Sequence, residues 1–133
     1  MVIMSKLVTI QKRNNLNEVY RIDAPGVGGA SHKYKVIKAH TAVTQDGDTL
    51  DENDVVAEIT FQHGPRKERD SVPGVLDCDL LEIVRDRLIA FNKGEFATRE
   101  NAIAITHIEE ALLWLNKRVE DRAERGVLGT TNK

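Results

Sequence analysis

Hydrophobic residues recur every three or four positions through the last third of the chain. Within residues 96–126 this spacing predicts one long helix with an apolar seam like that of a short coiled coil. We expect Thr98 to cap the helix, Glu100 to complement the helix dipole in the first turn, and Gly126 to end it. The residues of the seam are Ile105, Ile108, Leu112, Leu115 and Val119.

A second, shorter helix is predicted just before the long one. It is expected to begin with Asp77 or Asp79 as its cap and to run to about Phe91, with Gly94 in the break that follows. The two helices would then form an antiparallel hairpin. The apolar positions of the shorter helix are Leu80, Leu81, Val84, Leu88 and Phe91.

The first half of the chain has the pattern of β-strands. Residues 55–62 alternate, which predicts a strand with one buried face, and residues 7–12, 18–23 and 32–43 also favour strands. Asn14 and Asn15 tolerate turn conformations, residues 24–30 form a flexible connection, and 64–74 form a charged loop. The buried face of the alternating strand would hold Val55, Ala57, Ile59 and Phe61.

These elements predict an α+β fold, in which an N-terminal antiparallel β-sheet is followed by a C-terminal antiparallel helical hairpin. We expect one domain over residues 1–133, with a sheet region over about 1–75, the hairpin over 76–126 and a tail over 127–133. Apolar residues of the long helix also lie off its seam, Trp114 among them. Either one small domain buries them all, or the hairpin mediates a homodimer or larger assembly.

Composition narrows the class of protein. The net charge of −2 over 133 residues argues against a protein that coats DNA, and no apolar run approaches the length of a membrane helix. The lone Cys78 excludes an intramolecular disulfide and fits a reducing cytoplasm. The four histidines lack metal-ligand spacing, and no pair of side chains stands out as a general acid and base. We therefore expect a binding protein, without a cofactor, a metal site or a catalytic residue.

Several residues could bind an anionic ligand. Arg118, Arg122 and Arg125 share one helical face, which suits an anion, although acidic neighbours could pair with them equally well. Asn101 falls in the first turn of the long helix, where an amide can donate and accept. Phe91 is either a core residue or an aromatic platform for a base.

Three motifs of the hairpin carry a resemblance to a known family. They are Phe96-Ala-Thr-Arg-Glu-Asn-Ala-Ile-Ala-Ile-Thr106, Ile108-Glu-Glu-Ala-Leu-Leu-Trp-Leu115 and Arg122-Ala-Glu-Arg-Gly-Val-Leu-Gly-Thr130. They resemble the hairpin that phage Thoeris anti-defence signal-sequestering proteins share with anti-CBASS cyclic-dinucleotide sponges. The upstream motifs resemble the Thoeris group specifically, so the likeness covers roughly residues 16–130. These upstream motifs are Ala30-Ser-His-Lys-Tyr34, Phe61-Gln-His-Gly-Pro65 and Leu80-Leu-Glu-Ile83.

The resemblance implies a sponge that acts in the cytoplasm of the infected bacterial host. Such proteins bind cyclic ADP-ribose isomers, including glycocyclic ADP-ribose, which TIR enzymes of Thoeris immunity make, and hold them without cleaving them. They assemble through their helices into homodimers and some into hexamers, and some hexamers also bind cyclic di- or trinucleotides of CBASS at separate sites. Two alternatives stay open: a hydrolase of cyclic nucleotide signals, and a structural oligomer without a small-molecule ligand.

The resemblance also implies the roles of particular residues. The aromatic residue and the asparagine of the family's ADP-ribose pocket match Phe91 and Asn101. The late arginine of the long helix matches Arg118, and the basic residues after it match Arg122 and Arg125. The family implicates a loop arginine that matches Arg66 in cyclic oligonucleotide binding, and the backbone of Gly129 and Thr130 would contact a base.

Overall fold

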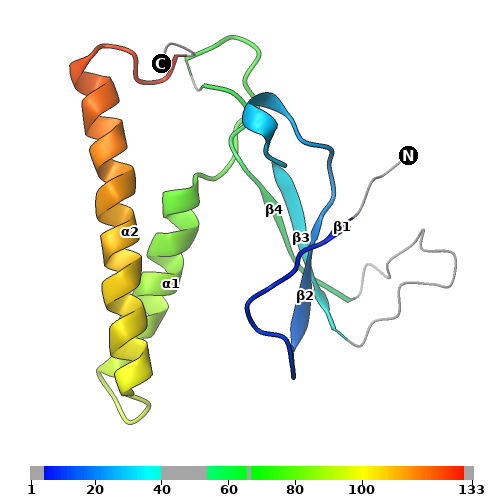
Figure 1. The fold of residues 1–133 in the computed structure, drawn as a ribbon, viewed down its shortest axis with the longest axis vertical. Helices are drawn as coiled ribbons and strands as arrows, with labels where there is room; N and C mark the ends of the chain where they lie inside the picture. Colours follow the sequence, from blue (N-terminus) through cyan, green and yellow to red (C-terminus); the bar gives the residue numbers. More distant parts are fainter. Residues whose placement is uncertain (1–4, 40–53, 66, 131–133) are drawn as a thin grey trace, which may run out of the picture. The chain divides into compact units, whose positions relative to one another are not determined.

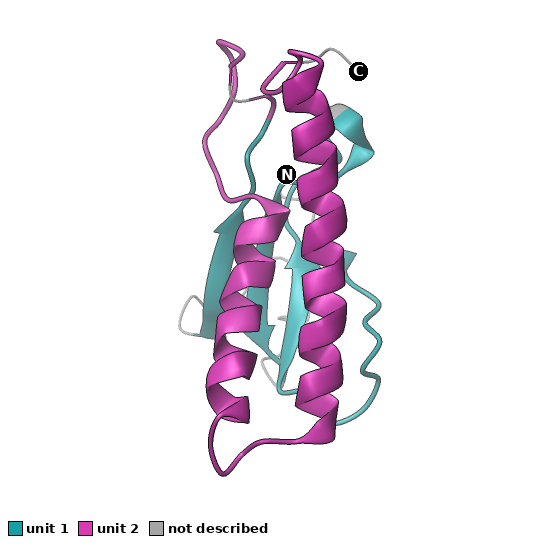
Figure 2. Ribbon diagram, turned by 90° about the vertical axis from the view of Figure 1, so that its left-hand side faces the viewer, with its two compact units in different colours: residues 1–63 teal, residues 64–133 magenta. Residues whose placement is uncertain are grey.

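The computed structural model describes residues 5–39, 54–65 and 67–130 (Figure 1). The chain forms two compact units, residues 1–63 and residues 64–133 (Figure 2). The first holds a four-stranded antiparallel sheet and the second a pair of helices. The predicted α+β fold, a sheet followed by a C-terminal helical hairpin, is therefore confirmed.

The sheet is built from strands in the order β1-β2-β3-β4, so each strand pairs with its neighbour in the sequence. A short 3-10 helix, η1, lies between β2 and β3. Antiparallel neighbours of this kind need no crossover connection, because the chain only has to reverse its direction between one strand and the next. The elements are β1 (Ser5–Lys6), β2 (Asn17–Arg21), η1 (Val27–Gly29), β3 (Lys33–Lys38) and β4 (Val55–Thr60).

The alternation predicted for the last strand is confirmed in β4. Val55, Ala57 and Ile59 are half-buried, whereas the residues between them are exposed. A register shift between Val36 and Ile37 of β3 places Ile37 opposite Val55. Such a bulge bends the strand and increases its local twist.

Tyr20 and Ile37 are the buried hydrophobic side chains of the described part of the chain, at 8% and 1% exposure. The Tyr20 hydroxyl donates a 2.7 Å hydrogen bond to the Glu18 carboxylate. Burial, followed by this bond, raises the pKa of Tyr20 to about 12. The same bond, supported by Lys6 at 3.2 Å, lowers the pKa of Glu18.

The strand predicted over residues 7–12 is wrong, because β1 covers only Ser5–Lys6. The sequence there closes a turn in which Asn14 has a left-handed φ of 57°. Within that turn the Thr9 hydroxyl and the Asn15 side-chain amide donate to the Gln11 carbonyl, at 2.8 and 3.1 Å. These local bonds compete with the sheet ladder. The strand predicted over 32–43 ends at Lys38, and residues 40–53 lie outside the described part.

Two antiparallel helices, α1 (Asp77–Asn92) and α2 (Arg99–Glu124), form the hairpin of the second unit (Figure 2). The predicted cap of α1 is wrong, because Leu76 occupies the cap position. Asp79 instead lies in the first turn, where its carboxylate accepts a 2.8 Å bond from the Leu76 N–H. This is the returning half of a capping box, and an acidic residue at the third helical position can supply it without being the cap.

The predicted ends of α2 are confirmed. Thr98 is the N-cap, and its hydroxyl accepts a 3.0 Å bond from the Asn101 N–H. At the other end Gly126 has a φ of 72°, and the Val127 N–H returns to the Arg122 carbonyl at 3.0 Å. This pattern is a Schellman motif, which glycine favours because it has no Cβ.

The hairpin buries its apolar residues only in part. Four seam residues, Ile105 to Leu115, are half-buried, but Val119 is 41% exposed and Trp114 is 71% exposed. In α1 and α2, which are described in full, no residue is buried. Among the described residues, no helix is both long and apolar enough to cross a membrane.

Candidate functional site

The turn of the hairpin brings two of the predicted site residues together. Phe91, in the last turn of α1, is 43% exposed and packs edge-on against Phe96, with ring centroids 6.5 Å apart. The Arg87 guanidinium lies 5.4 Å from the centroid of the Phe91 ring. An exposed aromatic face beside a cation is suited to a planar, anionic ligand.

Asn101 lies on the α2 side of the same turn. Its side-chain amide points to the Phe96 carbonyl at 3.5 Å, while its backbone N–H is used by the Thr98 cap. The Thr98 N–H in turn donates to the Asn92 side chain at 2.9 Å, which ties the end of α1 to the start of α2. We call Phe91, Phe96 and Asn101 the hairpin-turn cluster.

The three arginines of α2 differ in their surroundings. Arg118 and Arg125 are exposed, and their side chains have no hydrogen-bond or ion-pair partner among the described residues. Asp121, one of the acidic neighbours, pairs with Lys117 at 3.3 Å instead. Among the described side chains, the neighbouring acidic residues therefore do not form ion pairs with this row of arginines.

Arg122 is half-buried and holds the end of the chain. Its Nη2 atom donates to the carbonyls of Val127 and Thr130, both at 3.0 Å. The Thr130 hydroxyl also donates to the Val127 carbonyl, at 2.6 Å. A guanidinium suits this role because it presents several donors in a fixed fork. Arg122 thus shapes the Gly129–Thr130 turn from within.

The charged loop after residue 64 is bonded to the same turn. The Lys67 N–H donates to the Gly129 carbonyl at 3.0 Å, and the Lys67 side chain covers the Gly129 backbone so closely that a Cβ there would meet Lys67 Cγ at 2.7 Å. Gly129 also has a φ of 80°. The predicted Arg66 lies outside the described residues. Sequence reasoning missed Lys67, although its place in a basic loop was a usable signal.

We call Arg118, Arg122, Gly129 and Thr130 the arginine-end cluster. Asn101 and Arg118 are about 26 Å apart along α2, since an α-helix rises about 1.5 Å per residue. A ligand pocket of about 300–1,000 Å³ is only about 7–10 Å across. Within one chain, the hairpin-turn cluster and the arginine-end cluster therefore cannot contact the same small ligand.

A groove also runs between α1 and α2 near the arginine-end cluster. Its volume is about 360 Å³, and apolar side chains of α2 form most of its wall. Cys78 and Glu82 of α1 close the other side. The α2 residues are Leu112, Leu113, Leu115, Asn116 and Val119.

Comparison with known proteins places this hairpin in a family. A family model described as "Acb2/Tad1, hairpin domain" matches residues 53–120, just over half of the chain. A phage protein named "Thoeris anti-defense 1", from Bacillus phage SBSphiJ7, is 50% identical over 78 residues, which are 59% of this chain and 54% of that protein. The aligned region thus spans about half the length of this relative.

The residues matched by the family model include part of the proposed site. Residues 53–120 contain β4, α1 and most of α2, and with them Phe91, Asn101 and Arg118. Arg122, Gly129 and Thr130 lie beyond its end. The resemblance seen in the sequence motifs is confirmed: the chain belongs to the Acb2/Tad1 hairpin family.

Proposed function

We propose that this chain is a phage anti-defence protein that sequesters cyclic ADP-ribose-type signals, glycocyclic ADP-ribose in particular, without cleaving them. Membership in the Acb2/Tad1 hairpin family and the similarity to a Thoeris anti-defence protein support this function. The signals would be those made by TIR enzymes of Thoeris immunity, and the protein would act in the cytoplasm of the infected host.

The observation that carries the proposal is the division of the site into two clusters at opposite ends of α2. The hairpin-turn cluster offers an exposed ring and an amide, and the arginine-end cluster offers the guanidinium of Arg118, which has no partner among the described residues. A cyclic ADP-ribose needs a platform for its purine and cations for its two phosphates. Each cluster supplies half of that chemistry.

Two hairpins packed antiparallel would complete the pocket. The hairpin-turn cluster of one copy would then lie beside the arginine-end cluster of the other, and two-fold symmetry would create the pocket twice. In this arrangement Phe91 stacks on the purine, Asn101 binds its edge or the ribose, and Arg118 binds a phosphate. Arg122 and Arg125 add positive charge, and the Gly129–Thr130 backbone contacts the base.

The exposed apolar surface of the helices supports self-association. Leu113 and Trp114 are 69% and 71% exposed and adjacent in the sequence, although monomers seldom leave such large side chains in water together. We propose a homodimer formed through α1 and α2, with hexamers built from such dimers. Cyclic di- or trinucleotides of CBASS would bind the hexamer at a separate site that includes Arg66.

Calorimetry with glycocyclic ADP-ribose, followed by denaturation and chromatography of the released ligand, tests the function. We expect tight binding and recovery of unchanged ligand. Altered ligand would instead identify a hydrolase, and a folded oligomer that binds no cyclic ADP-ribose isomer would identify a structural protein. Phe91→Ala should weaken binding about 5- to 150-fold, since base stacking on an aromatic ring contributes about 1–3 kcal/mol.

Mixing two variants tests whether the pocket lies between copies. Phe91→Ala and Arg118→Ala homodimers each carry one lesion in every pocket. A mixed dimer has one doubly damaged pocket and one intact pocket, so co-expression of both variants should restore full affinity to about a quarter of the sites. If each pocket lies within a single chain, mixing restores nothing. Arg125→Ala mixed with Arg118→Ala is the matched control, because both lesions then fall on the same side of the pocket.

A further inference from the structure

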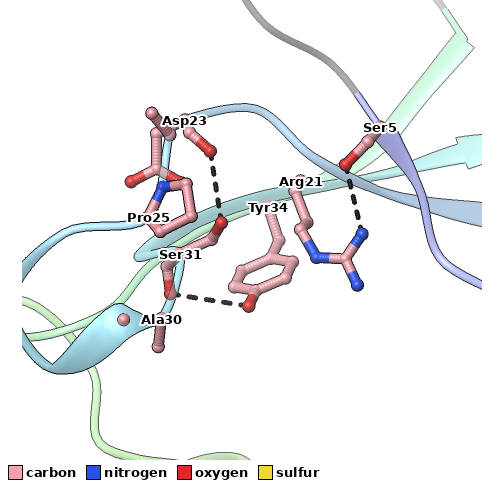
Figure 3. Close-up of a pocket in the computed structure, with 9 residues that line it drawn as sticks. Ser5, Arg21, Asp23, Pro25, Ala30, Ser31 and Tyr34 are labelled. Atoms are coloured by element: carbon pink, nitrogen blue, oxygen red, sulfur yellow. Dashed lines mark hydrogen bonds between the residues drawn. The ribbon is translucent and has the colours of Figure 1, made fainter.

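The sheet unit contains a hollow that is separate from the hairpin clusters. It lies where β2 ends and β3 begins, next to the connection that carries η1 (Figure 3). Its volume is about 430 Å³. Ser5, Arg21 and Tyr34 line it from the strands, and Pro25, Ala30 and Ser31 line it from the connection. All of these residues belong to the unit of residues 1–63.

Strand register explains why a cation and an aromatic ring meet there. Ser5 of β1 is opposite Arg21 of β2, and Arg21 is opposite Tyr34 of β3. Side chains directly opposite one another on adjacent strands project from the same face of the sheet. The Arg21 Nη1 atom donates to the Ser5 hydroxyl at 3.1 Å, at the edge of the hollow (Figure 3).

The charge of Arg21 is not neutralised within the described part of the chain. Its partner Ser5 is neutral, and no described carboxylate forms an ion pair with it. Asp23 also lines the hollow, but its carboxylate oxygens accept bonds from the backbone N–H groups of His32 and Lys33, at 3.0–3.1 Å. The acid is thereby committed to the backbone and leaves the guanidinium available to an anion.

Tyr34 gives the hollow a flat wall. Phe61 packs edge-on against its ring, with centroids 5.6 Å apart, and the Tyr34 hydroxyl points to the Ser31 carbonyl at 3.5 Å. Ser31, which is 9% exposed, donates to the Asp23 carbonyl at 3.2 Å and fastens the connection over the strands. The Phe61 contact therefore supports the Tyr34 ring in the absence of a ligand, whereas the hydroxyl bond, at the limit of hydrogen-bond length, adds little.

We propose that this hollow binds a phosphomonoester that carries a flat ring, such as a nucleoside monophosphate. The phosphate accepts hydrogen bonds from the Arg21 guanidinium and the Ser5 hydroxyl, and the ring lies along Tyr34 between Pro25 and Ala30. The volume falls in the usual range of small-molecule sites, and an aromatic wall with a few convergent polar groups is their usual composition. This site is independent of the signal pocket proposed for the hairpin.

Calorimetric titration with adenosine 5′-monophosphate, adenosine and inorganic phosphate tests the site. We expect the monophosphate to bind more tightly than either of its parts. Arg21→Gln should weaken its binding at least tenfold, or about 1.4 kcal/mol, because a charge-assisted bond is lost. Lys33→Gln is the matched control, because it also removes one positive charge. Lys33 is next to Tyr34 in the sequence but projects from the opposite face of β3, so its replacement should change the affinity less than about twofold.

Two further comparisons keep the test decisive. Tyr34→Leu should weaken binding while Tyr34→Phe retains it, because the ring and not the hydroxyl forms the wall. If Arg21→Gln proves unstable by circular dichroism, Ser5→Ala is the alternative test. It preserves every charge and should lower the affinity severalfold. Absence of monophosphate binding would overturn the proposal. Binding that survives Arg21→Gln but is lost in Asn101→Ala would also overturn it, because the nucleotide would then occupy the hairpin.

Discussion

Replacement of Arg122 by alanine should release the turn that follows α2. Two hydrogen bonds would be lost, from Nη2 to the carbonyls of Val127 and Thr130, each 3.0 Å long. A hydrogen bond to a charged group contributes about 1.5–3 kcal/mol. Arg122 is only half-buried, so water replaces part of what is lost. We therefore expect the pair together to contribute about 1.5–3 kcal/mol to local stability.

Native-state hydrogen exchange measures this local stability directly. The Thr130 N–H bonds the Val127 carbonyl at 3.1 Å, and the Lys67 N–H bonds the Gly129 carbonyl at 3.0 Å. Both amides depend on the turn that Arg122 holds. Since 1.4 kcal/mol corresponds to a factor of ten in an equilibrium constant, their protection should fall about 10- to 150-fold in Arg122→Ala.

Arg118→Ala is the matched control for Arg122→Ala. It removes the same charge from the same helical face, one turn earlier, where the side chain has no described partner. Exchange at Lys67 and Thr130 should stay unchanged in this variant. Unchanged exchange in Arg122→Ala, or an equal effect in both variants, would refute a positioning role for Arg122. If the role is confirmed, part of any loss of ligand affinity in Arg122→Ala would result from displacement of the Gly129–Thr130 turn.

Three further predictions concern stability. Gly126→Ala should destabilise the protein by about 1 kcal/mol in urea unfolding, because a φ of 72° is strained for a residue with a Cβ. Gly94, whose φ is not left-handed, is the control, and an equal loss of stability in Gly94→Ala would contradict this reason. Thr98→Ala should cost about 1 kcal/mol, measured in the same way, and Thr98→Ser should restore most of it, because only the hydroxyl caps α2. Partial burial alone would raise the pKa of Asp23, but hydrogen bonds from the backbone N–H groups of His32 and Lys33 outweigh it and lower that pKa. The carboxylate therefore stabilises the fold above its unfolded pKa, and this stabilisation is lost as the pH falls through its folded pKa. Urea unfolding of Asp23→Asn between about pH 6 and about pH 2 should accordingly show a smaller loss of stability than the unaltered chain, and parallel curves would refute it.

The proposed site residues of the hairpin lie at two distant ends of α2. Phe91 and Asn101 lie at the turn of the hairpin, whereas Arg118 lies about 26 Å away along α2. Variants at either end should impair the same pocket only if two copies share it. Under the proposed function, a variant that prevents self-association should therefore not bind the signal, even with every proposed pocket residue intact. Size-exclusion chromatography beside calorimetry measures both properties.

Local periodicity in the sequence is enough to predict α2 and β4. The three- and four-residue steps of Ile105 to Val119 define α2, and the alternation of Val55, Ala57 and Ile59 defines β4. Thr98 and Gly126 mark helix ends because capping involves only neighbouring backbone groups. The errors at residues 7–12 and at the cap of α1 arose where side chains bond the nearby backbone in competing ways.

The pairing of polar groups from distant parts of the chain could not be predicted from the sequence and is seen only in the folded structure. The Lys67 N–H and the Gly129 carbonyl are far apart in the sequence, and no periodicity relates them. Arg122 turns to the Val127 and Thr130 carbonyls, whereas Arg118, on the same helical face, does not, and strand register alone placed Arg21 between Ser5 and Tyr34. This difference arises because a hydrophobic pattern specifies only which face of an element is covered. The partner of a hydrogen-bonding group depends instead on where the chain returns, since such bonds are short and directional.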